Sequence, residues 1–170
     1  LGVTLPLLSW AEFNLYHKTA TKKRVKEIMP ILSNYYRWLE ANFKMPNGLF
    51  STPLSSTGMI NSPRSEARYF IDFNATMAMN ALYLSALGDI LNDKDASFQY
   101  KRDYFSIKTR INSKMWNPED GFYYDLDENE IQVRTKTLGT YWLLLAEIPN
   151  EERAEKLIAK LKDPSCFGTD

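Results

Sequence analysis

The sequence predicts an all-α fold assembled from helical hairpins, and three observations support this. Apolar residues recur at spacings of three and four over most of the 170 residues, which is the period of an amphipathic helix. Capping residues and breaks rich in glycine or proline separate these periodic stretches. Only the segment 122–134 resembles extended chain, so we expect one small β-hairpin among the helices.

The first two helices are expected to form one pair. Thr4 is the expected N-cap of the first helix, and Thr21 begins a second helix that continues to about residue 43. Pro30 interrupts the second helix, which predicts a kink or a break there. The apolar face expected for the first helix consists of Leu8, Ala11 and Leu15.

A long segment, residues 45–68, separates this pair from the rest of the chain. It is rich in Gly, Ser, Pro, Thr and Asn and shows no periodicity. A structureless loop of this length is uncommon inside a compact domain and is usually functional. We therefore expect a functional site in this loop.

Four more helices follow the loop. The third is expected at 72–91, with closely spaced alanines that predict tight helix contacts, and the fourth at 95–116. Two further helices are expected at 138–147 and 151–162, after the β-hairpin. Six helices in three antiparallel pairs fit either a solenoid or a closed ring of helix pairs.

Composition excludes several classes of function. The formal net charge is zero, which argues against nucleic acid or an anionic membrane as the main partner. No apolar run reaches the roughly 18 residues that a membrane-spanning helix needs. The single Cys166 excludes an internal disulfide, and the single His17 excludes a histidine-based metal site. We expect no metal and no cofactor.

Two motifs at the end of the loop carry a resemblance to a known family. The segment 58–64, Gly-Met-Ile-Asn-Ser-Pro-Arg, resembles the Gly-(Met/Trp)-Asp-Asn-Ser-Pro-Arg segment of family 63 glycoside hydrolases, which are related to the family 37 trehalases. The segment 72–75, Asp-Phe-Asn-Ala, resembles the Asp-Leu-Asn-Ala that opens a barrel helix in both groups. Stretches at 5–11, 115–125 and 163–167 agree in the same order, so the resemblance spans nearly the whole chain.

The resemblance implies an (α/α)6 toroid of six helical hairpins with its active site in the central funnel. It also implies inverting hydrolysis of an α-glycosidic bond, in an oligosaccharide of glucose or mannose or in a disaccharide such as trehalose. That reaction uses one carboxylic acid and one carboxylate, roughly 6.5–9.5 Å apart.

This sequence departs from the family pattern in two ways. Ile60 occupies the position of the family's general acid, and the family's other carboxylate lies beyond the part of the barrel that this chain matches. Glu66 and Asp72 are the nearby carboxylates that could replace the acid, although Glu66 also fits a solvated loop charge and Asp72 a helix N-cap. Three helix pairs make half a toroid. We therefore expect residues 1–170 to be one domain, a fragment of a catalytic barrel, completed by the same longer chain or by another copy.

Four residues are expected to bind the sugar. Arg64 can hold hydroxyl groups with its planar fork, and the alternative is an ion pair with Glu66 or Asp72. Phe50 can stack on a sugar ring or plug the loop to the core. The two asparagines can bond hydroxyl groups, although asparagine also favours turns and helix starts. The set is Phe50, Asn61, Arg64 and Asn74.

Three functions follow from these observations. The first is a glycoside hydrolase domain. The second is a catalytically inactive carbohydrate-binding relative, because isoleucine at position 60 cannot donate a proton. The third is a helical-repeat interaction scaffold, against which the long polar loop argues.

Overall fold

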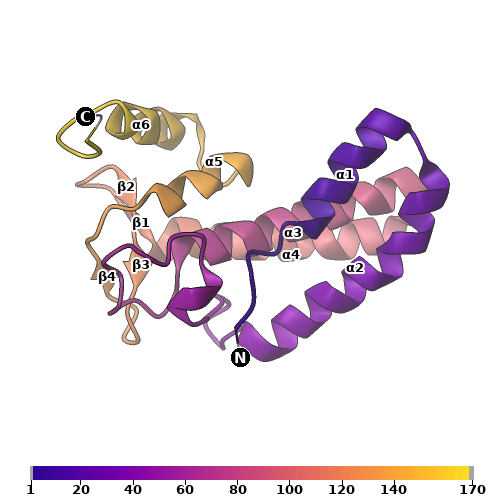
Figure 1. Ribbon diagram of the computed structural model, residues 1–170, viewed down its shortest axis with the longest axis horizontal. Helices are drawn as coiled ribbons and strands as arrows, with labels where there is room; N and C mark the ends of the chain where they lie inside the picture. Colours follow the sequence, from indigo (N-terminus) through magenta and orange to yellow (C-terminus); the bar gives the residue numbers. More distant parts are fainter. Residues whose placement is uncertain (1, 169–170) are drawn as a thin grey trace.

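The computed structural model describes residues 2–168, and its helices pair in sequence order (Figure 1). The predicted all-α architecture with three serial helix pairs is confirmed. The pairs are α1 (Leu8–Thr19) with α2 (Lys22–Phe43), α3 (Ile71–Leu91) with α4 (Lys94–Lys114), and α5 (Trp142–Leu145) with α6 (Glu151–Leu161). In the part of the chain described, no helix is long and apolar enough to cross a membrane.

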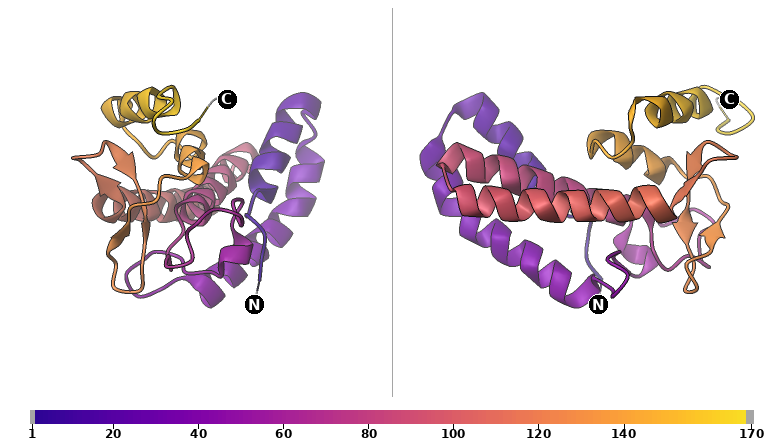
Figure 2. Two further views of the ribbon diagram at one scale, coloured as in Figure 1. Left: turned by 60° about the vertical axis from the view of Figure 1, so that its left-hand side comes forward. Right: turned by 180° about the vertical axis from the view of Figure 1, so that it is seen from behind.

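Helix α3 is the centre of the fold, with α1, α2, α4 and α5 packed around it (Figures 1 and 2). The predicted alanine-lined face is buried, and small residues let the neighbouring helices approach closely. Gly88 shows this directly, because a Cβ at that position would lie 2.9 Å from the backbone nitrogen of Ser97 on α4. The hydroxyl of Ser85 donates to the carbonyl of Ser97 at 2.9 Å, which joins the two helices further.

Helix α2 buries an apolar stripe along its length and passes through Pro30 without a break. Pro30 lies on the exposed side of the helix, where water can solvate the backbone carbonyl that loses its N–H partner. The expected break at Pro30 is therefore absent. The buried stripe consists of Val25, Met29, Leu32, Tyr36, Leu39 and Phe43.

Helix α1 faces the core with a different side from the one predicted. It begins at Leu8, and Leu7 rather than Thr4 is the residue before its first turn. Leu8 is 57% exposed, whereas Ser9 is buried and its hydroxyl bonds to the Asn80 side chain on α3. Contacts with α3 therefore orient the helix, and of the predicted face Leu8 and Ala11 are exposed while Leu15 is half-buried.

The segment expected to be one β-hairpin contributes to two. Strand β1 (Trp116–Asn117) pairs with β2 (Phe122–Tyr123), and β3 (Asp125–Leu126) pairs with β4 (Gln132–Val133). Gly121, with φ of +61°, makes the first turn possible. Leu126 also forms a β-bridge with Tyr69, just before α3. The second hairpin is thus joined to the end of the long loop.

The helix expected at 138–147 is shorter in the structure. A 3-10 turn at Leu138–Tyr141 leads into α5, and Thr137 caps this turn by accepting from the backbone N–H of Gly139 at 3.2 Å. The turn, the two hairpins and the beginning of α3 gather at one end of the molecule (Figure 1). This arrangement places the long loop next to residues from three distant parts of the sequence.

Candidate functional site

The tip of the long loop, Gly58 to Ser62, surrounds a small open hollow of about 360 Å³. The Ser62 backbone N–H and hydroxyl both donate to the Met59 carbonyl, at 3.1 and 2.8 Å, and this closes the tip into a turn. Ile60 projects from the turn and is 57% exposed. The loop tip therefore carries an accessible apolar side chain beside a hollow.

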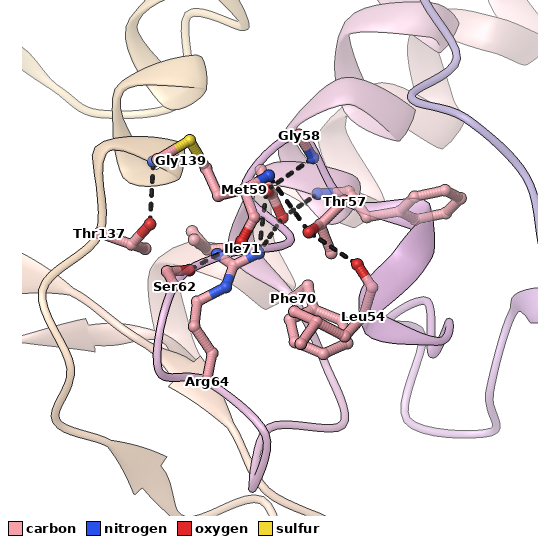
Figure 3. Close-up of polar contacts among 12 residues, drawn as sticks. Leu54, Thr57, Gly58, Met59, Ser62, Arg64, Phe70, Ile71, Thr137 and Gly139 are labelled. Atoms are coloured by element: carbon pink, nitrogen blue, oxygen red, sulfur yellow. Dashed lines mark hydrogen bonds and ion pairs between the residues drawn. The ribbon is translucent and has the colours of Figure 1, made fainter.

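Next to this tip lies a buried charged cluster formed by Arg64, Asp72 and Asp125, here called the Arg64 cluster. Figure 3 shows Arg64 with its neighbours Phe70 and Gly139. The Nη2 of Arg64 donates to both carboxylate oxygens of Asp72, at 3.2 and 3.0 Å. Its Nε lies 3.5 Å from Oδ2 of Asp125. All three side chains are at most 1% exposed, so one buried cation faces two buried carboxylates.

Asp125 caps helix α3 from a distant part of the chain. Its Oδ1 accepts the backbone N–H of Ile71, the first residue of the helix, at 2.7 Å. The pKa of Asp125 is raised to about 6, chiefly by burial and to a smaller extent by the nearby Asp72 carboxylate, although Arg64 and the Ile71 N–H oppose the shift. Asp125 is therefore partly protonated at mildly acidic pH.

Two neighbours complete the wall of the Arg64 cluster. The guanidinium carbon of Arg64 lies 5.0 Å from the centre of the Phe70 ring, a cation–π distance. Gly139 packs against the opposite side, as Figure 3 shows. A Cβ at Gly139 would lie 3.1 Å from Oδ2 of Asp72 and 3.2 Å from Nη1 of Arg64. Only glycine leaves room for the cluster at this point.

The structure brings together two of the predicted sugar-binding residues, Phe50 and Asn74, inside the core. The Asn74 side chain accepts from the Phe50 backbone N–H at 2.8 Å and donates to the Phe50 and Phe70 carbonyls, each at 2.9 Å. Both residues are fully buried. Asn74 thereby fastens the start of the long loop to α3, and the Phe50 ring packs on Phe73, as the alternative of a plug to the core describes.

The remaining predicted residues divide into an exposed and a buried set. Asn61 borders the hollow and is exposed, and Glu66 is exposed with no ion pair among residues 2–168. Arg64 pairs with Asp72 rather than with Glu66. Asp72 is not the N-cap of α3, because the helix begins one residue earlier and Phe70 occupies the cap position. The catalytic and sugar-binding roles of these residues stay predictions.

The sequence argument missed Asp125 and Gly139 as parts of the site. Asp125 was expected only as a residue of the hairpin, although it is the last residue of the 115–125 stretch that resembles the family. Nothing in the sequence pointed to Gly139 as a neighbour of the charged residues, because an isolated glycine at the start of an expected helix indicates only a cap. Across residues 2–168, no group of three or more His, Cys, Asp or Glu side chains could hold a metal ion.

A larger open hollow, about 1060 Å³, lies elsewhere, between α2 and α4. Its α2 side carries Lys22, Lys26 and Arg37, whereas its α4 side carries Asp93 and Asp95. None of the residues of the long loop borders it. We place the functional site at the loop tip, because the motif residues and the buried charges meet there.

Serial helical hairpins with a long loop over one end are the architecture of helical-toroid proteins, and the chain matches about half of such a toroid. The family comparison then identifies the group within this class. The chain belongs to the mannosylglycerate hydrolase MGH1-like glycoside hydrolase domain family, whose model matches residues 3–170.

A longer protein is similar to almost the whole of this chain. The chain is 49% identical over 168 residues to an uncharacterized protein of Borreliella burgdorferi, covering 99% of this chain and 35% of that protein. The chain thus spans about a third of the length of this relative.

Solved structures share the fold. A family 63 mannosylglycerate hydrolase from Thermus thermophilus, in complex with glucose, superposes with a TM-score of 0.82 at 20% identity, covering 93% of this chain and 50% of that one. The same hydrolase in complex with Tris and D-glycerate gives a TM-score of 0.81 at 18% identity, with 93% and 54% coverage. A sialidase matches with a TM-score of 0.73 at 16% identity, covering 84% of this chain and 14% of that protein. The chain corresponds to about half of the family 63 toroid.

Proposed function

We propose that this chain forms half of the sugar-binding funnel of a glycoside hydrolase toroid, and that its ligand is a short α-linked glucoside or mannoside. Family membership supports the class of ligand, because the mannosylglycerate hydrolase with the same fold was solved with glucose and with D-glycerate. The observation that carries the proposal is the loop tip, which exposes Ile60 and Asn61 beside a hollow above a sealed charged cluster.

Inverting hydrolysis requires a proton donor and a base on opposite sides of the glycosidic bond. Ile60 has no dissociable proton, and its exposed methyl groups offer only apolar contact to the C–H face of a sugar. Asp72 is fully buried and both of its oxygens bond to Arg64. We therefore propose that this half of the toroid binds the sugar without supplying the usual acid.

A second candidate keeps the hydrolase activity, with Glu66 as the replacement acid. Glu66 is an exposed carboxylate in the same loop, six residues after Ile60, and no ion pair of residues 2–168 occupies it. A free carboxyl group of this kind could reach a leaving-group oxygen from outside the hollow. The base would come from the remaining half of the toroid.

Both candidates require the toroid to be completed. Exposed apolar side chains lie on α1 at one end of the series of helix pairs and on α5 and α6 at the other. Further helices packed on these two ends would bury this apolar surface. Because the Borreliella relative and the mannosylglycerate hydrolase are two to three times longer than this chain, we propose that the remaining half belongs to the same longer polypeptide. The exposed residues are Leu8, Leu145, Ile158 and Leu161.

The test uses the full-length protein with trehalose, glucosylglycerate and mannosylglycerate as ligands. Binding is measured by calorimetry and hydrolysis by release of free sugar. We expect the natural protein to bind at least one of these sugars without cleaving it. The Ile60→Asp variant should gain hydrolysis, and Ile60→Asn is its matched control, because asparagine has the same shape as aspartate and no acid.

The outcomes separate the two candidates. Cleavage by the natural protein that is lost in Glu66→Gln would favour Glu66 as the acid. Cleavage that survives Glu66→Gln would place the acid outside this chain. Absence of binding to every sugar, in a correctly folded full-length protein, would refute the proposed ligand class.

A further inference from the structure

We infer that Asp72 is a positioning residue, which holds both ends of the Gly58–Ser62 tip with a single carboxylate. Oδ2 of Asp72 accepts the backbone N–H of Gly58 at 3.3 Å, at the beginning of the tip. The same oxygen lies 3.0 Å from Nη2 of Arg64, two residues after the end of the tip. This inference rests on the proposed function, because the tip matters only as a wall of the sugar site.

The tip has few other attachments to the core. Its internal bonds join Ser62 to Met59, and the Met59 N–H donates to the hydroxyl of Thr57 at 3.3 Å. These bonds shape the turn but do not fasten it to α3. The carboxylate of Asp72, on the first turn of α3, supplies that attachment. Without it, the turn could keep its shape and still move relative to the helix.

Arg64 cannot leave its place to bind a ligand directly. Its side chain is fully buried between Asp72, Asp125, Phe70 and Gly139. A buried guanidinium that loses one carboxylate partner leaves an uncompensated charge in the interior, which is strongly unfavourable. The side chains of Arg64 and Asp72 therefore act on the sugar through the loop that they hold.

The burial of the cluster also explains why aspartate is needed at position 72. Its two oxygens accept four hydrogen bonds. One comes from the Gly58 N–H, one from the Phe73 N–H, and two come from Nη2 of Arg64, which contacts both oxygens. Asparagine is of the same size, but its amide group is a donor and must face one of these donors. The Asp72→Asn variant therefore breaks the attachment with little change in volume.

The experiment measures hydrogen exchange of individual amides in the full-length protein, comparing the natural protein with Asp72→Asn. We expect exchange of the Gly58 amide to accelerate by about tenfold or more, the factor that the loss of one charge-assisted hydrogen bond corresponds to. Amides of α6, which does not touch the cluster, should keep their rates. Glu66→Gln removes an exposed carboxylate from the same loop and should leave all rates unchanged.

Two results would overturn the inference. Unchanged exchange at Gly58 in Asp72→Asn would show that the tip is held by other contacts. Acceleration that is equal in the tip and in α6 would show that Asp72 contributes only to global stability.

Sugar affinity gives an independent readout. Weaker binding of trehalose, glucosylglycerate or mannosylglycerate in Asp72→Asn supports the positioning role, provided that Asp95→Asn, the same replacement at an exposed aspartate of α4 away from the loop, leaves binding unchanged. If no sugar binds to the natural protein, the proposed function fails, while the exchange rates still decide whether Asp72 holds the tip.

Discussion

Replacement of Asp125 by asparagine should change how the stability of the protein depends on pH. Burial raises the pKa of Asp125 from 3.8 to about 6. Because this pKa is raised in the folded state, the stability that the protonated form provides is complete below about pH 4. It is lost as the pH rises through about 6. The interval from 3.8 to about 6 corresponds to about 3 kcal/mol of unfolding free energy.

Asparagine at position 125 stays neutral at every pH and keeps an oxygen that can accept the Ile71 N–H. The attraction between ionised Asp125 and Arg64 is already contained in the pKa of about 6, so it needs no separate correction. The measurement is urea unfolding by tryptophan fluorescence at several pH values from about 4 to 8. As the pH rises over this range, the natural protein should lose free energy of unfolding that Asp125→Asn keeps. The difference in free energy of unfolding, Asp125→Asn minus natural protein, should therefore rise by about 3 kcal/mol. Parallel curves for the two proteins would refute the reasoning.

Three other substitutions, two of them with a control substitution, test packing, helix capping and buried hydrogen bonds by urea unfolding at neutral pH. Gly139→Ala should cost about 1–3 kcal/mol because its Cβ meets Asp72 and Arg64, whereas Gly168→Ala, with open space around it, should cost almost nothing. Asp93→Ala should cost about 1 kcal/mol because it removes the N-cap bond to α4. Thr21→Ala should cost less, because the Thr21 side chain makes no cap bond to α2. Asn74→Ala should cost at least about 2 kcal/mol, since it leaves the buried backbone N–H and carbonyl of Phe50 without their partner; a smaller loss would mean that water replaces the side chain.

Much of the fold could be predicted because helical periodicity is a local property of the sequence. The six apolar positions of α2 and the alanines of α3 are spaced by three and four residues, and both helices appear where expected. The long loop was recognisable by its composition. The Arg64–Asp72 ion pair was one of the two alternatives considered for Arg64, because the residues stand only eight positions apart.

The rest depends on contacts between distant residues, which periodicity does not report. The orientation of α1 follows from Ser9 meeting Asn80, 71 residues later. Asp125 and Gly139 reach the site because a hairpin and a 3-10 turn fold back on α3. The expected apolar face of α1 was misleading for another reason. Leu8 is exposed and Leu15 is half-buried, so the apolar spacing did not report which side of the helix faces α3.

The remote capping of α3 has a consequence for the order of events during protein synthesis. Ile71 leaves the ribosome 54 residues before Asp125 does, a delay of about 3–10 s at typical elongation rates. Until then the first turn of α3 has no acceptor for its leading N–H, and Arg64 has only one of its two carboxylates. The nascent chain can therefore assemble the α1–α2 pair early. The long loop acquires its final support only when the second hairpin has emerged.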